Sequence, residues 1–88
     1  GVAPRRDGAE LSKEISSGLG GNKNMKDVDF CLTRLRVRVK TMKEVVDATL
    51  MSTGSNVVNR VSDTDVQVIY GPQVERIAGE VKSALGIA

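Results

Sequence analysis

The chain has 88 residues, enough for one compact domain and too few for two. Thirteen basic and eleven acidic residues give a net charge of +2, which is weak evidence for a polyanionic partner. The single cysteine cannot form an internal disulfide, and without any histidine it cannot join a Cys/His zinc cluster. Apolar runs are too short for a transmembrane span. Composition therefore predicts a small soluble domain with one free thiol.

The first eight residues mix proline, glycine and charge without a period, and they predict a tail or linker before a domain spanning 9–88. Asp7, followed by Glu10 three positions later, predicts the start of a helix. Apolar residues then recur at helical spacing, at Leu11, Ile15 and Leu19. The glycines that follow predict that this helix ends near Gly18 to Gly20.

From Met25 to Lys40 the pattern alternates, as in strands. Val28 and Phe30 share one face before Cys31, which predicts a short first strand. Beyond it, the apolar Leu35, Val37 and Val39 alternate with the cations Arg34, Arg36, Arg38 and Lys40. A turn within residues 31–34 would join the two strands as a hairpin and place the Cys31 thiol at or beside its tip.

In the second half of the chain, Thr41 and Glu44 have the spacing of a capping box and predict a helix from about Met42 to Thr53. Its buried stripe is predicted to be Val45, Val46 and Leu50 with Met42 or Met51, and Gly54 would end it. Residues 57–61 and 66–70 read as strands around a turn at 62–65. Pro72 would start a last helix ending at Gly86.

The predicted order is α-β-β-α-β-β-α. Hairpins with one apolar face, together with amphipathic helices, predict an α+β fold: a four-stranded antiparallel sheet with three helices packed on one face.

One segment combines the side chains best suited to chemistry: Cys31, Thr33, Arg34 and Arg36. Guanidinium groups bind a dianionic phosphoryl group through forked hydrogen bonds, and the Thr33 hydroxyl with backbone N–H groups of the turn would complete an anion nest. These groups suit attack by sulfur on phosphorus. A buried structural thiol beside a solvated arginine face is the alternative, and for such a pattern alone it is the commoner one.

Two other known motifs do not explain this sequence. A cysteine phosphatase needs arginine six positions after the cysteine, where this chain has Val37. Gly18 to Gly21 match the GxxG loop of RNA-binding KH domains, but the element order is wrong and helix-ending glycines explain the match. With only two aromatic residues and little net charge, no nucleic-acid partner is expected.

Asp29-Phe30-Cys31-Leu32-Thr33-Arg34-Leu35-Arg36-Val37 closely resembles the active-site motif of IIB domains in the glucose family of the bacterial sugar phosphotransferase system. Residues 19–25 resemble the family's segment before the first strand, and residues 66–72 resemble its fourth strand and the turn into the last helix. The likeness runs in register over about residues 11–85.

The resemblance implies a phosphoryl relay. Cys31 would accept a phosphoryl group from a phosphohistidine on a IIA partner and pass it to a sugar held by a membrane IIC domain. Arg34 and Arg36 would hold the phosphoryl group, and Thr33 would shape the pocket. Leu32, Arg34, Arg36 and Arg38 are the residues expected to contact partners.

The resemblance also places the domain at the cytoplasmic face of the bacterial inner membrane, with no direct lipid contact and no metal or organic cofactor. Two departures from the family pattern stand out, Phe30 before the cysteine and Asp63-Thr64-Asp65 in the last hairpin turn. The alternative function is a IIB-like regulatory or docking module without onward sugar phosphorylation.

Overall fold

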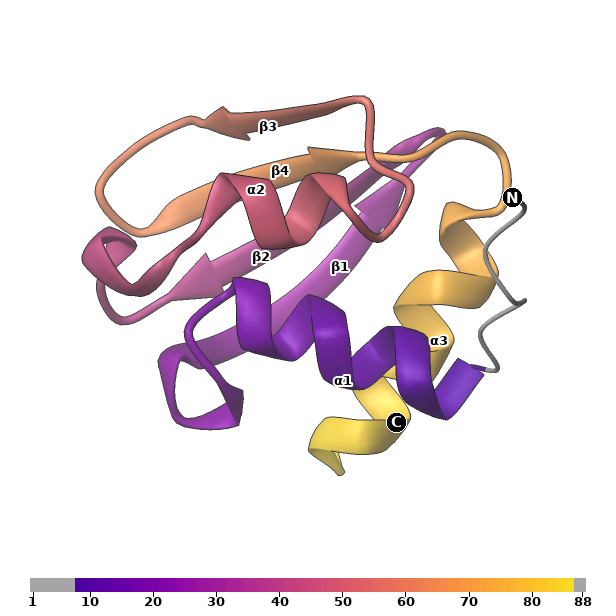
Figure 1. Ribbon diagram of the computed structural model, residues 1–88, viewed down its shortest axis with the longest axis horizontal. Coiled ribbons are helices and arrows are strands. Elements are labelled where there is room, and N and C mark those ends of the chain that lie inside the picture. Colours follow the sequence, from indigo (N-terminus) through magenta and orange to yellow (C-terminus); the bar gives the residue numbers. More distant parts are fainter. Residues whose placement is uncertain (1–7, 87–88) are drawn as a thin grey trace.

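The computed structural model of the protein describes residues 8–86, so most of the predicted tail, including Asp7, lies outside the described residues. In chain order the elements are α1 (Gly8–Gly18), the 3-10 turn η1 (Asn22–Asn24), β1 (Met25–Cys31), β2 (Arg34–Val39), the 3-10 turn η2 (Met42–Glu44), α2 (Asp47–Met51), β3 (Val57–Arg60), β4 (Asp65–Ile69) and α3 (Val74–Leu85). The predicted α+β class and element order are confirmed (Figure 1).

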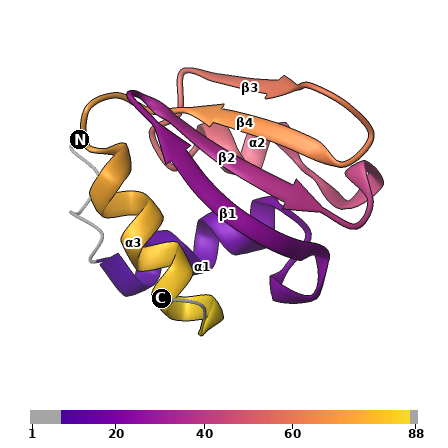
Figure 2. The ribbon, with the colours of Figure 1, turned by 180° about the vertical axis from the view of Figure 1, so that it is seen from behind.

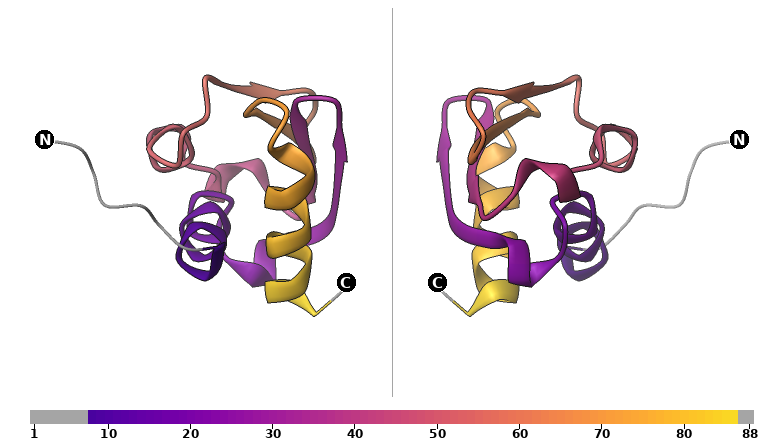
Figure 3. Two further views of the ribbon diagram at one scale, coloured as in Figure 1. Left: turned by 90° about the vertical axis from the view of Figure 1, so that its right-hand side faces the viewer. Right: turned by 90° about the vertical axis from the view of Figure 1, so that its left-hand side faces the viewer.

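The four strands form one antiparallel sheet in the order β1-β2-β4-β3. The two hairpins therefore meet at the centre, where β2 pairs with β4. From behind, the sheet lies in front of α1 and α2, and α3 runs beside β1 (Figure 2). The edge-on views place the helices on one side of the sheet (Figure 3). The opposite side, here called the open face, carries no helix from residues 8–86.

Alternation along β2 divides the molecule into a core and an open face. Leu35, Val37 and Val39 are buried under the helices, whereas the arginines between them are exposed. Further core residues come from every helix and strand pair, and they include Ile15, Leu19, Val28, Leu50, Val66, Val68, Val74 and Val81. Burial of one face of the sheet fixes the register, because a shift of one residue would bring the arginines into the core.

The β1 strand lies at the edge of the sheet and has an irregularity near its start, where Met25 pairs with Val39 but Asp27 pairs with Arg38. In an antiparallel pair every second residue points its N–H away from the partner strand. Here Asp27 accepts a hydrogen bond from the N–H of Val28 at 3.0 Å. Asp29 accepts one from the N–H of Phe30 at 2.8 Å.

The predicted helix from Met42 to Thr53 is wrong in its length. Thr41 caps as expected, accepting from the N–H of Lys43 at 3.3 Å, but the turn it caps is the three-residue η2. Val45 and Val46 are extended, and α2 has only five residues. β-Branched residues favour extended backbone, and tertiary bonds hold the pair there: Val46 donates to the carbonyl of Gly18 at 2.7 Å.

One side chain from β3 reinforces this break. Arg60 donates to the carbonyl of Val45 at 3.2 Å and forms an ion pair with Asp47 at 2.5 Å. The hydrogen bond to Asp47 is the main reason that the pKa of Arg60 is raised. Val46 and Met51 remain about half exposed, so the buried stripe is reduced mainly to Val45 and Leu50.

At the C-terminal end, Pro72 lies in the turn before α3, two residues ahead of its first helical residue. Gly86 ends α3 in the left-handed conformation with φ of 78°, as predicted for a C-terminal glycine. Among the helices of residues 8–86, none has the length and apolarity needed to cross a membrane.

Candidate functional site

Cys31 is the last residue of β1 and is exposed. It pairs directly with Arg34, the first residue of β2, across the two-residue turn Leu32-Thr33. Leu32 has φ of +44° and is the only residue besides glycine with a positive φ in the described chain. Positive φ at the first turn position alone is the pattern of a type II′ turn. The predicted hairpin, with the thiol beside its tip, is confirmed.

Strand register determines which side chains share the open face with Cys31. Paired residues on antiparallel strands project to the same side of a sheet. The first row across the open face is therefore Cys31, Arg34, Ile69 and Val57. The second row is Asp29, Arg36, Gln67 and Asn59. The third begins with Asp27, Arg38 and Asp65.

Arg34 is the cation directly opposite the thiol, and a second polar side chain orients it. Its Nη1 donates to Oε1 of Gln67 on β4 at 3.1 Å. This bond uses one of the five N–H donors of the guanidinium group and leaves the others for an anion. Arg34 and Cys31 thus lie together as the sequence predicted.

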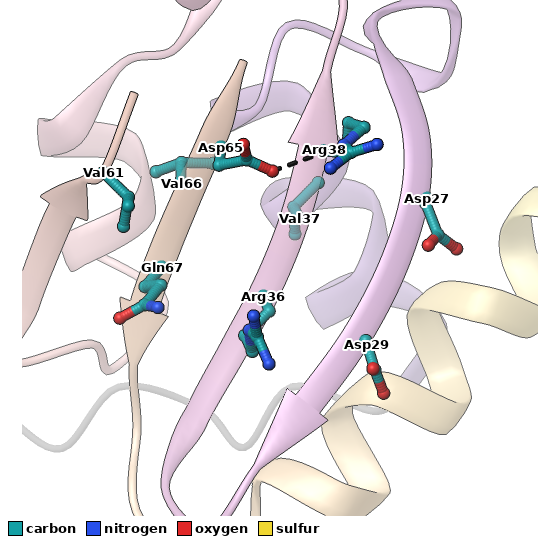
Figure 4. A pocket seen from close by; sticks show the side chains of 9 residues that line it. All are labelled: Asp27, Asp29, Arg36, Val37, Arg38, Val61, Asp65, Val66 and Gln67. Carbon is teal, nitrogen blue, oxygen red and sulfur yellow. Dashed lines mark hydrogen bonds and ion pairs between the residues drawn. The ribbon is translucent and has the colours of Figure 1, made fainter. Parts of the chain in front are cut away.

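Arg36 lies one row further from the tip, between Asp29 on β1 and Gln67 on β4 (Figure 4). It is diagonal to Cys31, and diagonal neighbours across a strand pair are about 7–8 Å apart, within reach of a long side chain. Among residues 8–86, the Arg36 side chain makes no hydrogen bond or ion pair. An open hollow of about 350 Å³ lies over this part of the sheet.

Arg38 lies in the third row and has a carboxylate partner. Its Nε is 3.3 Å from Oδ1 of Asp65. A hydrogen bond from Ser62, followed by the contact with Arg38, holds the pKa of Asp65 below its usual range. Arg38 is thus two rows from the thiol and paired, whereas Arg34 and Arg36 are nearer to Cys31.

The two departures from the family motif do not obstruct the thiol. The Asp63-Thr64-Asp65 turn joins β3 and β4 at the end of the sheet away from Cys31, because Asp65 pairs with Arg38 and Ile69 with Arg34. Phe30 pairs with Leu35, so it projects toward the helix side and leaves the open face clear. Neither feature covers Cys31.

The backbone of Thr33 anchors the turn to the rest of the fold. Its carbonyl accepts from the N–H of Tyr70 at 2.8 Å and of Gly71 at 3.2 Å. The Tyr70 hydroxyl lies 2.7 Å from Oγ1 of Thr53, and Thr53 donates its own proton to the carbonyl of Leu50 at 2.5 Å. Tyr70 is therefore the donor to Thr53, and these bonds connect α2 with the hairpin that carries the thiol.

Sequence reasoning missed the contributions of Gln67 and Tyr70. Alternation in residues 66–70 places Gln67 on the polar side of its strand. No local pattern in the sequence, however, indicates that β4 pairs with β2 rather than with an edge strand of the sheet. The register of the central pair decides that Gln67 meets Arg34.

Comparisons with known proteins bear on this site. A family model described as "phosphotransferase system, EIIB" matches residues 13–45, a range that contains the whole β1–β2 hairpin. The PTS system N-acetylglucosamine-specific EIICB component of Bacillus subtilis is 43% identical over 68 residues, or 77% of this chain. The N-acetylglucosamine-specific EIICBA component of Klebsiella pneumoniae is 33% identical over 76 residues, or 86% of this chain. The chain spans only 15% and 12% of those two proteins.

A shorter relative matches almost from end to end. The PTS system N-acetylglucosamine-specific EIIB component of Streptomyces coelicolor is 32% identical over 77 residues, which are 88% of this chain and 99% of that protein. Among solved structures, one domain of the PTS system IIabc component from Clostridium difficile has a TM-score of 0.62 and 26% identity, covering 89% of this chain and 82% of that one. With the α+β fold and the Cys31 hairpin, these matches show that the chain belongs to the EIIB family of the phosphotransferase system, in its glucose branch.

Proposed function

We propose that this chain is the phosphoryl-carrier domain of a sugar transporter. Cys31 accepts a phosphoryl group from a phosphohistidine on a IIA partner and passes it to a sugar bound by a membrane IIC domain. The observation that carries the proposal is the exposed thiol at the end of β1, directly opposite Arg34 on the open face. A structural thiol would instead be expected in the core.

The two transfers are balanced group exchanges. In the first, the Cys31 sulfur attacks phosphorus as the N–P bond of the phosphohistidine breaks, and the thiol proton passes to the departing imidazole. In the second, a sugar hydroxyl attacks phosphorus as the S–P bond breaks, and its proton returns to sulfur. Transfer of this kind depends mainly on positioning and charge stabilisation. The exposed hairpin tip leaves room for in-line approach by either partner.

The side chains around Cys31 have distinct proposed roles in binding the phosphoryl group and the partners. Arg34, held by Gln67, is placed to neutralise the phosphoryl oxygens beside Cys31. Arg36 reaches the same group diagonally or meets acidic residues of the IIA partner. The Thr33 hydroxyl shapes the pocket, and its carbonyl holds the turn. Arg38, paired with Asp65, contributes to the field that attracts an acidic partner.

The names of the relatives support the kinds of partner. EIICB and EIICBA components join the B domain to C, or to C and A, in one protein. For this chain we propose an IIC sugar-translocating domain and an IIA phosphoryl donor as partners, and the cytoplasmic face of the bacterial inner membrane as its location. N-acetylglucosamine and glucose are both named among the relatives.

The test is intact-protein mass after incubation with phosphoenolpyruvate and the purified upstream proteins. The parent should gain one phosphoryl group, and Cys31→Ser should not. Because the chain has one cysteine and no histidine, blocked alkylation of the phosphorylated protein would locate the group on Cys31. Adding membranes with sugar should remove it. A folded parent that no IIA partner labels would contradict the proposal.

Conservative arginine variants test the pocket. Arg34→Lys and Arg36→Lys keep the charge but lose forked hydrogen bonding, so both should slow transfer more than they change stability. Arg76→Lys on α3 is the matched control and should transfer at the parental rate. Equal rates in all three variants would argue against phosphoryl binding by Arg34 and Arg36. Labelling that no sugar-loaded membrane discharges would favour the regulatory module.

A further inference from the structure

The β3 strand is the second edge of the sheet, and among residues 8–86 no strand lies on its outer side (Figure 1). Backbone hydrogen bonds show which of its groups point outward. Val39 donates to the carbonyl of Thr64 at 2.8 Å, so the even-numbered positions along β4 bond to β2. The odd-numbered positions bond to β3, and accordingly Val61 donates to the carbonyl of Asp65 at 2.9 Å.

This alternation leaves two residues of β3 facing outward, Val58 and Arg60. Their backbone N–H and C=O groups point away from β4, and no group of the described residues accepts from either N–H. The β1 edge differs, because its two outward N–H groups have carboxylate acceptors. The β3 strand therefore presents two donors and two acceptors on which another strand can pair.

The side chains along this edge also favour pairing. Val57 is 50% exposed and Val61 is 57% exposed, and both lie on the open face with Asn59 midway between them. Arg60, the charged residue of β3, projects to the helix side and is already ion-paired with Asp47. The edge therefore brings two apolar side chains and no unpaired charge to a second strand, whereas charged side chains are a common means of preventing such pairing.

We infer that this edge binds a second copy of the chain, with the two β3 strands antiparallel about a twofold axis at Asn59. In this register Val58 of each copy lies opposite Arg60 of the other, and each such pair exchanges two N–H···O bonds. Val57 of each copy lies opposite Val61 of the other, which forms two apolar cross-strand pairs. The strand is thus complementary to itself, as an interface with twofold symmetry requires.

The neighbouring registers are less favourable. A twofold axis at Arg60 places two guanidinium-bearing residues directly opposite each other. An axis at Val58 places Val57 opposite Asn59 and separates the apolar pairs. Association ends at two copies, because each β3 edge is then occupied and the outward N–H groups of β1 are already bound.

The dimer keeps both Cys31 thiols exposed. Paired residues project to the same side of a sheet, so the two open faces form one continuous face. Because β1 and β3 are opposite edges, the two thiols lie on the outermost strands, at a separation on the order of 30 Å. A partner bound at one Cys31 therefore leaves the other accessible, and the inference is independent of the function proposed for Cys31.

Sedimentation velocity over a concentration series tests for the dimer. A pairing of this size is transient, and its dissociation constant should be about 0.1–1 mM, so the series extends from about 10 μM to about 1 mM. Val61→Lys places a cation in each apolar pair and should raise that constant about tenfold or more. Val46→Lys is the matched control, because Val46 is 47% exposed but lies beside the end of α1, and it should leave the constant unchanged.

Disulfide trapping tests the register in a Cys31→Ser background. Asn59→Cys brings two thiols together in a pair without mutual hydrogen bonds, where the Cα atoms are about 4.5 Å apart and a disulfide can form. Its covalent dimer should form at least about tenfold faster than that of Val57→Cys, the control, whose thiol faces a valine.

A chain that stays monomeric up to about 1 mM overturns the inference, and so does a species that grows beyond two copies. A dimer that Val61→Lys leaves intact would assign the contact to another surface and would also overturn it. Faster trapping of Val57→Cys than of Asn59→Cys would exclude the proposed register. A monomeric parent that is still phosphorylated on Cys31 would leave the proposed function standing.

Discussion

Tyr70 offers a sharp test of how the hairpin is held, because it is the one tyrosine in the chain. It is 5% exposed, and burial raises its pKa from 10.0 to about 12. A raised pKa means that the folded protein holds this proton more tightly than the unfolded chain. The corresponding stability is complete below pH 10 and is lost as the pH rises toward 12. A difference of about two pH units corresponds to roughly 2–3 kcal/mol of unfolding free energy.

The assay is the near-ultraviolet absorbance of tyrosinate followed against pH, which reports this single group. The folded domain should titrate near pH 12, and the chain in denaturant near pH 10. Tyr70→Phe removes the hydrogen bond to Thr53, so its unfolding free energy at neutral pH should be about 1 kcal/mol below that of the parent. Because this variant has no hydroxyl to ionise, its stability should fall less than that of the parent between pH 10 and 12. Titration near pH 10 with the fold intact would refute the burial of the Tyr70 hydroxyl beside Thr53.

Three other predictions concern the fold. Leu50→Ala should lower the unfolding free energy by about 2–5 kcal/mol in a urea titration, since Leu50 is fully buried; a loss below about 1 kcal/mol would contradict that packing. Gly18→Ala should destabilise by about 1–3 kcal/mol, because the added Cβ would lie 2.8 Å from the fully buried Leu50 side chain, and an unchanged midpoint would disprove the close approach. The lowered pKa of Asp65 stabilises the fold above about pH 4 and is lost in acid, so the melting temperatures of parent and Asp65→Asn should converge as the pH falls below 4. A constant difference from pH 7 to pH 3 would count against the contacts of Asp65 with Ser62 and Arg38.

Most of the fold could be predicted because its hydrophobic periods are clear. Alternation in residues 35–39 and 66–70 marks the two central strands, each with one buried face. The predicted helix over 42–53 failed because tertiary bonds override local propensity there. Arg60 comes from β3 to bond the carbonyl of Val45, and the extended Val46 bonds Gly18. Residues so distant in the sequence leave no local signal of that contact.

The proximity of Cys31 and Arg34 could be predicted from the sequence, but the remaining arrangement of the candidate site could not. Cys31 and Arg34 meet across a tight turn, which local alternation already suggests. Whether Arg36 is nearer to sulfur or to Asp29 depends on strand register, and the contact of Gln67 with Arg34 depends on the order of strands in the sheet. The positive φ of Leu32 could not be foreseen, since leucine carries no signal for a left-handed turn position.

The two aspartates of β1 have a consequence for how the domain behaves in a crowded solution. An uncovered edge strand is normally a template on which another chain extends the sheet, the route to edge-to-edge aggregation. Here the outward N–H groups of Val28 and Phe30 are already bound by the carboxylates of Asp27 and Asp29. Another molecule of the protein that approaches this edge therefore meets two carboxylates and no free backbone N–H donor at these two positions. The strand that ends in the exposed Cys31 thiol can therefore lie at the edge of the sheet without pairing with the strand of another molecule.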